Sequence, residues 1–343
     1  MYVPPNVVTN NDLLKYMDTS DEWIQERTGI KERRYAHRTE ETTTTMGIEA
    51  AKIAIERAGL IPQDIDFIIF ATICPDYYFP GCGVLLQRAM KMKEIGALDV
   101  RDQCSGFLYA LSVGDQFIKT GMYKNILVVG AEKHSFGLDF TTRGRNVSVI
   151  FGDGAGAVIL QPMDTSTGSG RGILSTHLHS DGESAELLAM YNPGTHANHW
   201  VKEQALADFD KAEVGEMFFS HAMIDKAQVF PNMDGPAVFK KAVEKFPEVI
   251  LEALNANGLQ ASDLNLLIPH QANLRISQFV QKKLRLRDDQ VHNNIQKYGN
   301  TTAASVPIAL CEAWEEGKVK EGDLICLAAF GSGFTWGSAL LRW

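Results

Sequence analysis

The chain has 343 residues, of which 45% are hydrophobic and 22% charged, a composition typical of globular proteins that excludes a disordered or low-complexity chain. Its formal net charge of -9 disfavours nonspecific binding to nucleic acid or to an anionic membrane, so an anionic partner would have to meet a local basic patch. The five cysteines show no CxxC spacing, and neither an apolar leader nor a run of about 18 apolar residues is present, so we expect a reducing, cytoplasmic location.

Apolar runs and helical patterns alternate along the chain. The runs at 65–71, 126–130, 147–151, 157–160, 264–268 and 324–329 predict buried strands. Segments with apolar residues at i, i+3 and i+4 predict helices at 46–58, 106–120 and 238–254. This alternation predicts an α/β fold.

An internal repeat relates the two ends of the chain. Residues 54–70 align with residues 253–269, so that Gly59 matches Gly258 and Asp64 matches Asp263, each pair 199 positions apart. A helix followed by a Gly-Leu turn and a strand is a common junction in α/β proteins and could recur by chance. Ala110 and Ala309 match at the same offset, which favours a duplication. We therefore expect two pseudo-symmetric α/β halves, 1–165 and 166–343, the second carrying a long insertion at about 183–232.

Three polar residues stand at strand ends or helix starts, where open α/β sheets build their sites. Cys104 falls between the strand-like run 97–100 and the next helix, and the positive end of a helix dipole there would favour its thiolate, although a cysteine in this position is more often a small core residue. His270 follows the strand 264–268, and Asn300 precedes a helix predicted at 303–314. In a duplicated fold these junctions would meet and form a site for nucleophilic catalysis.

Two other patterns do not predict sites. GDGAG, at 152–156, precedes an apolar strand rather than the helix N-terminus that a phosphate loop requires. The histidines of the insertion, His196, His199 and His221, do not form a metal-site pattern, so we expect no metal.

Six motifs together resemble the β-ketoacyl-acyl-carrier-protein synthase III family of thiolase-like condensing enzymes. They are DVRDQCSGFLYAL around Cys104, PHQAN around His270, YGNTTAASVP around Asn300, FGDGAGA at 151–157, DTSDEWIQERTGI at 18–30 and FGSGFTWGSALLRW at 330–343. The resemblance implies a five-layered αβαβα fold and a homodimer. It also implies a decarboxylating Claisen condensation of an acyl-CoA primer with malonyl-acyl-carrier-protein, with no cofactor besides these substrates.

The resemblance also implies a role for individual residues. Cys104 would be the nucleophile, His270 and Asn300 would stabilise the enolate, and the backbone amides of Cys104 and Ser332 would form the oxyanion hole. The positions that match the coenzyme A site are Trp23, Arg27, Arg145 and Asn273. Those that match the carrier-protein surface are Lys240, Arg275, Lys282 and Lys283, and Phe79 matches the residue that enters the partner subunit's acyl pocket.

Three features depart from the family pattern. The chain opens at Tyr2-Val3-Pro4-Pro5, where the family usually has a full strand first, which leaves open whether that strand is absent or the recorded start is late; Ser332 stands where glycine is frequent, and the insertion is longer than usual. These departures leave alternatives open: a specialised condensing enzyme of secondary metabolism that uses longer or unusual acyl groups, acyl transfer to a nucleophile other than carbon, or a noncatalytic acyl-CoA or carrier-protein binding module.

Overall fold

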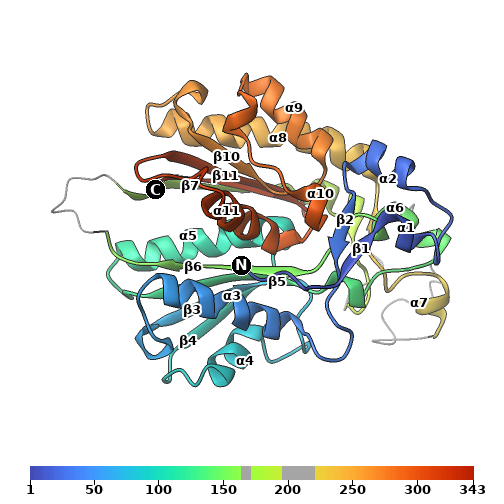
Figure 1. Cartoon of the computed structure of the whole chain (residues 1–343), viewed down its shortest axis with the longest axis horizontal. Coiled ribbons are helices and arrows are strands. Elements are labelled where there is room, and N and C mark those ends of the chain that lie inside the picture. The colour runs from blue at the N-terminus through green and yellow to red at the C-terminus, as the bar shows by residue number, and fades with distance from the viewer. Residues whose placement is uncertain (164–170, 195–220) are drawn as a thin grey trace.

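The computed structural model describes residues 1–163, 171–194 and 221–343. Two four-stranded sheets dominate it (Figure 1). The first has the order β4 (Gly96–Val100), β3 (Phe67–Ala71), β5 (Ile126–Glu132) and β6 (Gly154–Leu160). The second has the order β10 (Leu266–Pro269), β11 (Leu324–Gly331), β12 (Thr335–Arg342) and β7 (Gly172–Ser180).

Helices cover both faces of each sheet. Between the sheets lie α5 (Gly106–Lys119) and α11 (Ser305–Glu315), while α3 (Thr43–Arg57) and α4 (Cys82–Ala89) cover the outer face of the first sheet and α8 (Gly235–Ala256) and α9 (Leu274–Leu284) that of the second (Figure 1). Because each sheet is buried on both faces, its central strands are continuously apolar rather than alternating. The prediction of a five-layered αβαβα fold is confirmed.

The structure explains the 199-residue repeat. Gly59 and Gly258 both have φ of +68°, a left-handed conformation that costs glycine little, and each ends a long helix. Asp64 and Asp263 then accept hydrogen bonds from the amides of Ile61 (2.9 Å) and Gln260 (2.8 Å), which closes a 3₁₀ turn before β3 and before β10. The halves are thus pseudo-symmetric, whereas the boundary expected at residue 165 lies outside the described residues.

The pairing of the strands repeats as well. β3 pairs with β5 in parallel, as β10 does with β11, and an antiparallel strand follows each, β6 or β12. On the far side of β12 lies β7, whereas β6 is met there by an isolated antiparallel bridge between Tyr2 and Ala155. Tyr2 thus lies beside β6 where β7 lies beside β12.

One predicted strand is wrong. Residues 147–151 form the end of α6 (Arg145–Ser148) and a turn, and β6 starts only at Gly154. The run is apolar because its side chains pack with Leu13, Ile24 and Ile295 in a separate small core rather than in a sheet. Around this core lie β1 (Val7–Thr9), α1 (Asn10–Leu13), α2 (Asp21–Thr28), β2 (Glu32–Arg34) and α10 (Ile295–Tyr298).

The insertion is described only at its two ends. Its described elements are β8 (Leu188–Ala189), which pairs with β9 (Asn232–Met233), and α7 (His221–Asp225). Residues 195–220, with His196 and His199, lie outside the described part of the chain. No helix of the described residues is long and apolar enough to cross a membrane.

Candidate active site

Cys104, His270 and Asn300 line one cavity of about 780 Å³. Cys104 comes from the turn between β4 and α5, His270 directly follows β10, and Asn300 follows α10. All three side chains are buried, at 8%, 3% and 6% exposure. The two halves therefore bring together the residues that the motifs selected, around a space large enough for the end of a substrate.

Cys104 sits on a tightly constrained turn. The preceding residue, Gln103, has φ of +44°, and a Cβ on Gly331 would lie only 2.7 Å from the Cβ of Cys104 and 3.2 Å from its sulfur. A side chain at position 331 would therefore crowd Cys104, and glycine lets this backbone pass beside the sulfur. Burial, and secondly the charge of Glu132, raise the pKa of the Cys104 thiol to about 12. Backbone hydrogen bonding at the turn opposes this rise, as expected near a helix start, but burial outweighs it.

The hydrogen bonds of His270 orient its imidazole. Nδ1 lies 2.5 Å from Ser305 Oγ, whereas the buried Nε2 has no hydrogen-bond partner among the residues that the structure describes. The backbone amide of Gln271 also donates to Ser305 Oγ (3.4 Å), and with the Ser305 hydroxyl donating to Nδ1 the neutral ring carries its proton on Nε2. Burial, and next the nearby His134, lower the pKa of His270 to about 3. The ring is therefore neutral at physiological pH and presents an Nε2–H donor to the cavity.

Asn300 is fixed by its backbone and by its own side chain. Its backbone N–H donates to Ile150 O (2.9 Å), and its backbone carbonyl accepts from Gly152 N (3.0 Å). Its Oδ1 accepts from Thr302 N (2.8 Å), which leaves Nδ2 as the end available to a ligand. Two hydrogen-bond donors, His270 Nε2 and Asn300 Nδ2, thus serve the same cavity as the Cys104 thiol.

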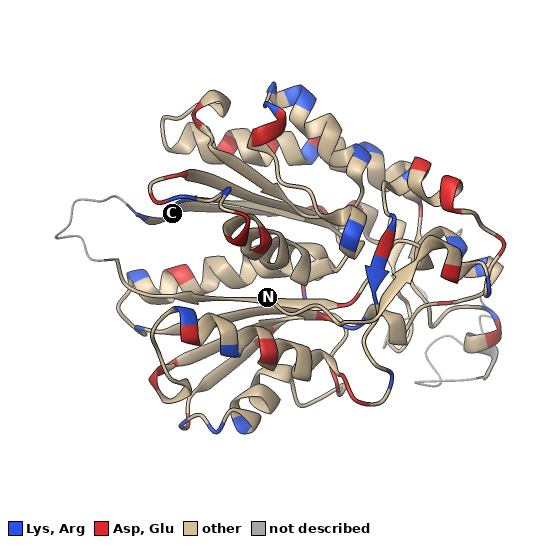
Figure 2. Cartoon of the chain, in the orientation of Figure 1, with Lys and Arg blue, Asp and Glu red and all other residues tan. Residues whose placement is uncertain are grey.

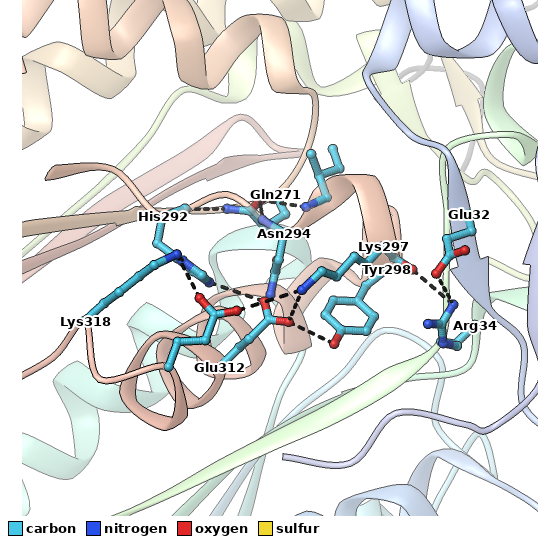
Figure 3. A network of polar contacts seen from close by, with 11 residues as sticks. Glu32, Arg34, Gln271, His292, Asn294, Lys297, Tyr298, Glu312 and Lys318 are labelled. Atoms are coloured by element: carbon cyan, nitrogen blue, oxygen red, sulfur yellow. Dashed lines mark hydrogen bonds and ion pairs between the residues drawn. The ribbon is translucent and has the colours of Figure 1, made fainter. Parts of the chain in front are cut away.

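A polar network supports the loop between these two donors (Figure 3). Gln271 Oε1 accepts from the amides of Asn294 (2.9 Å) and Ile295 (3.1 Å), at the start of α10. Glu312, on α11, accepts hydrogen bonds from Lys297 Nζ (2.9 Å) and Tyr298 Oη (3.0 Å), which lie at the end of α10. Burial raises the pKa of Glu312, but hydrogen bonds from surrounding groups outweigh it and lower the pKa to about 2. An ionised carboxylate therefore ties α10 to α11 just before Asn300.

The predicted coenzyme A residues cluster at one side of the cavity. Trp23, Arg27 and Asn273 line it. The guanidinium carbons of Arg27 and Arg145 lie 4.5 Å and 5.2 Å from the ring centre of Trp23, within range of cation–π attraction. Asn273 caps α9 through Arg275 N (2.9 Å) and donates to Arg27 O (2.8 Å), which joins α9 to α2. Arg145 is not among the lining residues and reaches this group only through Trp23.

The other predicted residues lie at varying distances from the cavity. The Ser332 hydroxyl donates to Leu188 O, and Ser332 is not among the described residues that line the cavity. The φ of Ser332 is not positive, so serine fits there without strain. The positive φ of this turn, +133°, belongs to Gly333. Phe79 is 80% exposed, between β3 and α4.

The four cations predicted for the carrier-protein surface are exposed on α8 and α9 (Figure 2). Arg275 lines the cavity and its guanidinium lies 5.7 Å from the ring centre of Phe239. Lys282 and Lys283 lie in the last turn of α9, about 10 Å along the helix from Arg275. Lys240 lies on α8, which packs beside α9.

Several residues of the site had no clear sequence signal. Gly331, Ser305 and Thr302 touch or orient the three central residues, and only their places within motifs point to them. Cys74, Glu132 and His134, buried or half-buried close by, offer sulfur, oxygen and nitrogen atoms within 4.8 Å of one another, a group that could hold a metal ion. Since Cys74 is 58 and 60 positions from Glu132 and His134, only the fold reveals this cluster.

Known proteins resemble this chain over its whole length. The family model for 3-oxoacyl-[acyl-carrier-protein] synthase III matches residues 98–182, and the model for its C-terminal part matches residues 254–343. The chain is 44% identical over 343 residues to the β-ketoacyl-[acyl-carrier-protein] synthase III of Aquifex aeolicus, which covers 100% of this chain and 97% of that relative. It belongs to the β-ketoacyl-acyl-carrier-protein synthase III family.

Solved structures of synthase III agree with this membership. The enzyme of Aquifex aeolicus matches with a TM-score of 0.84, over 100% of this chain and 97% of that one. The enzyme of Thermus thermophilus matches with a TM-score of 0.87 at 35% identity, over the same shares of the two chains. The predicted family, thiolase-like fold and acyltransferase class are confirmed.

Proposed function

We propose that this synthase III condenses an acyl-CoA primer with malonyl-acyl-carrier-protein in two half-reactions that share Cys104. In the first, the Cys104 sulfur attacks the thioester carbonyl of the primer, the bond to the coenzyme A sulfur breaks, and the thiol proton ends on coenzyme A. The negative charge on the carbonyl oxygen would be stabilised by backbone amides, those of Cys104 and of the turn at Gly331 and Ser332. Gly331 lies close enough to the sulfur for this role.

The second half-reaction needs donors for an enolate. When the malonyl group loses carbon dioxide, negative charge develops on its thioester oxygen, and His270 Nε2–H and Asn300 Nδ2 are donors that share the cavity with Cys104. The resulting carbanion attacks the acyl group on Cys104, and the sulfur leaves as the β-ketoacyl-carrier-protein forms. The departing Cys104 thiolate takes a proton from water, so the two thioesters and one proton give the β-ketoacyl thioester, carbon dioxide and coenzyme A, and the reaction requires no cofactor.

Binding and assembly follow from the same surface. We assign Trp23, Arg27, Arg145 and Asn273 to coenzyme A, because a ring flanked by guanidinium groups suits a purine and its phosphates. The cations of α8 and α9 would receive the acidic carrier protein.

Phe79, exposed beside Tyr77 and Tyr78, would enter the acyl pocket of a second subunit, which makes the enzyme a homodimer. The five free cysteines fit the cytoplasm.

The observation that carries the proposal is the meeting of Cys104, His270 and Asn300 in one cavity beside Trp23 and Arg27. Incubation with radiolabelled acyl-CoA, then malonyl-carrier-protein, should place label on Cys104 and afterwards in a β-ketoacyl product. Cys104→Ala should give neither. Wild-type protein that stays unlabelled, or a product that is an ester or amide, would contradict the condensation.

The same assay addresses the primer. The cavity is also lined by apolar side chains of α8 and β11, those of Val238, Phe239, Ala242, Phe246 and Phe330. Comparing acetyl-CoA with longer and branched acyl-CoA separates fatty-acid initiation from a specialised enzyme of secondary metabolism: a preference for acetyl or other short primers supports initiation, and exclusive use of long or unusual ones supports the alternative.

A further inference from the structure

A buried glutamine, Gln271, follows His270 in the sequence and holds the loop that carries it. Gln271 is only 3% exposed. Its side-chain Nε2 donates to Pro269 O (2.6 Å), in the residue just before His270, and at a longer distance to His292 O (3.4 Å). Its backbone N–H donates to Ser305 Oγ (3.4 Å), the same hydroxyl that meets His270 Nδ1. Gln271 is therefore part of the frame around the imidazole.

The side-chain oxygen of Gln271 holds the segment that leads to Asn300 (Figure 3). This oxygen, Oε1, accepts from the backbone amides of Asn294 (2.9 Å) and Ile295 (3.1 Å), where α10 begins. The helix is a single turn of four residues and ends two positions before Asn300. A shift at the start of α10 would therefore reach Asn300 through a short stretch of backbone.

The partners of the Gln271 carboxamide fix its orientation. A carboxamide offers two N–H donors and an oxygen with two lone pairs, and all four positions are used here. The two carbonyl partners can only accept and the two amide partners can only donate, so the nitrogen and the oxygen cannot be exchanged. The side chain thus acts as a rigid spacer between the loop of His270 and the start of α10.

This spacing matters for the two enolate donors. One enolate oxygen has to receive hydrogen bonds from His270 Nε2 and Asn300 Nδ2 together, and such bonds weaken steeply away from their usual length and angle. The donors come from separate loops, one after β10 and one after α10. Gln271 joins the first loop to the start of α10, while Glu312 joins the end of α10 to α11.

We propose that Gln271 is a positioning residue for the condensation step: it sets the distance between the donors of His270 and Asn300 that stabilise the enolate. The assignment rests on the proposed function and deepens it. It implies an effect on one half-reaction only. Among the described residues, no hydrogen-bond partner of Gln271 belongs to the turn of Cys104, so acylation of the sulfur should not depend on it.

A second buried glutamine supplies a matched control. Gln290 is also 3% exposed, and its side chain also bridges backbone groups: it donates to Leu264 O (2.5 Å) and accepts from Arg287 N (3.0 Å). These contacts lie at the opposite end of β10 from His270. Methionine is close to glutamine in length and lacks its hydrogen bonds, so Gln271→Met and Gln290→Met are comparable losses, but only the first loosens the donors.

The test measures the two half-reactions separately. Radiolabelled acyl-CoA gives the rate of Cys104 acylation, and carbon dioxide released from labelled malonyl-carrier-protein by the acylated enzyme gives the rate of decarboxylation. Thermal unfolding compares the stability of the variants. Because a misplacement of about 1 Å costs about 100-fold, we expect decarboxylation about 10- to 100-fold slower in Gln271→Met, with acylation within about twofold of wild type. In Gln290→Met both rates should stay within about twofold of wild type.

The outcomes separate a positioning role from a structural one. Decarboxylation in Gln271→Met at the wild-type rate, equal slowing of both half-reactions, or the same loss in Gln290→Met would overturn the proposal. Should Gln271→Met fail to fold, Gln271→Glu, which keeps both acceptor positions toward α10 but loses the Nε2 donor, is held to the same selective slowing, by about threefold or more. A wild type that forms no β-ketoacyl product would refute the proposed function and this assignment with it, whereas a condensing wild type with an unaffected Gln271→Met would overturn this assignment alone.

Discussion

Gly331 offers the sharpest perturbation of the nucleophile, because its effect can be calculated from contacts. An added Cβ would lie 2.7 Å from Cys104 Cβ, 3.0 Å from its amide nitrogen and 3.2 Å from its sulfur. Carbon atoms normally approach to about 3.5–4.0 Å, so one of the two backbones must move by about 1 Å. The φ of Gly331 is not positive, so alanine is conformationally allowed and the effect is purely steric.

A displacement of about 1 Å at a reacting group costs about 100-fold in rate. We therefore expect Gly331→Ala to acylate Cys104 about 100-fold more slowly, with a loss of stability of about 1–3 kcal/mol from overpacking. Quenched-flow labelling with radiolabelled acyl-CoA measures the rate, and thermal unfolding verifies the fold. Gly182→Ala is the matched control, since no atom of the described part of the chain lies within 4 Å of an added Cβ there. Acylation of Gly331→Ala within twofold of wild type would refute the placement of this strand beside the sulfur.

Three more outcomes follow from the site. Ser305→Ala removes the partner of His270 Nδ1, so decarboxylation of malonyl-carrier-protein should slow about tenfold while acylation of Cys104 keeps its rate; equal slowing of both steps would contradict the assignment. Trp23→Ala should raise the KM for acyl-CoA about two- to thirtyfold but leave the acyl-pantetheine reaction unchanged, and an equal loss with both substrates would argue against a coenzyme A role. Burial lowers the pKa of His134 and His270 to about 3, so below about pH 6.5 the unfolded chain binds protons that the folded chain does not, and stability falls with falling pH. The unfolding free energy, measured by urea titration at pH 6 and at pH 5, should therefore fall by about 1 kcal/mol less in His134→Phe than in wild type. An equal fall in the two proteins would mean that His134 is not held neutral.

Local signals with a direct physical cause could be read from the sequence. Gly59 and Gly258 mark left-handed helix ends, and Asp64 and Asp263 close the turns that follow, so the repeat survives in the fold as a repeat of backbone geometry. Cys104, His270 and Asn300 were found through their motifs, and the structure brings them to one cavity, although their catalytic roles remain predictions.

Signals that depend on tertiary packing could not be read in this way. The apolar run at 147–151 resembles a strand because its residues are buried on several sides, but their partners, Leu13 and Ile295, come from distant segments. The high pKa of Cys104 also has its main cause in burial, which a rule about helix ends cannot anticipate. His134 and Thr302 are 168 positions apart and meet only in the folded chain.

The central claim is that one cavity runs two half-reactions with different residues. The most direct measurement follows acyl-Cys104 by intact-protein mass spectrometry, first after acyl-CoA and then after malonyl-carrier-protein, in wild type, His270→Ala and Asn300→Ala. We expect all three proteins to gain the acyl group, wild type to discharge it as β-ketoacyl product, and both variants to retain it. Discharge at the wild-type rate in either variant, or condensation product from Cys104→Ala, would contradict the claim.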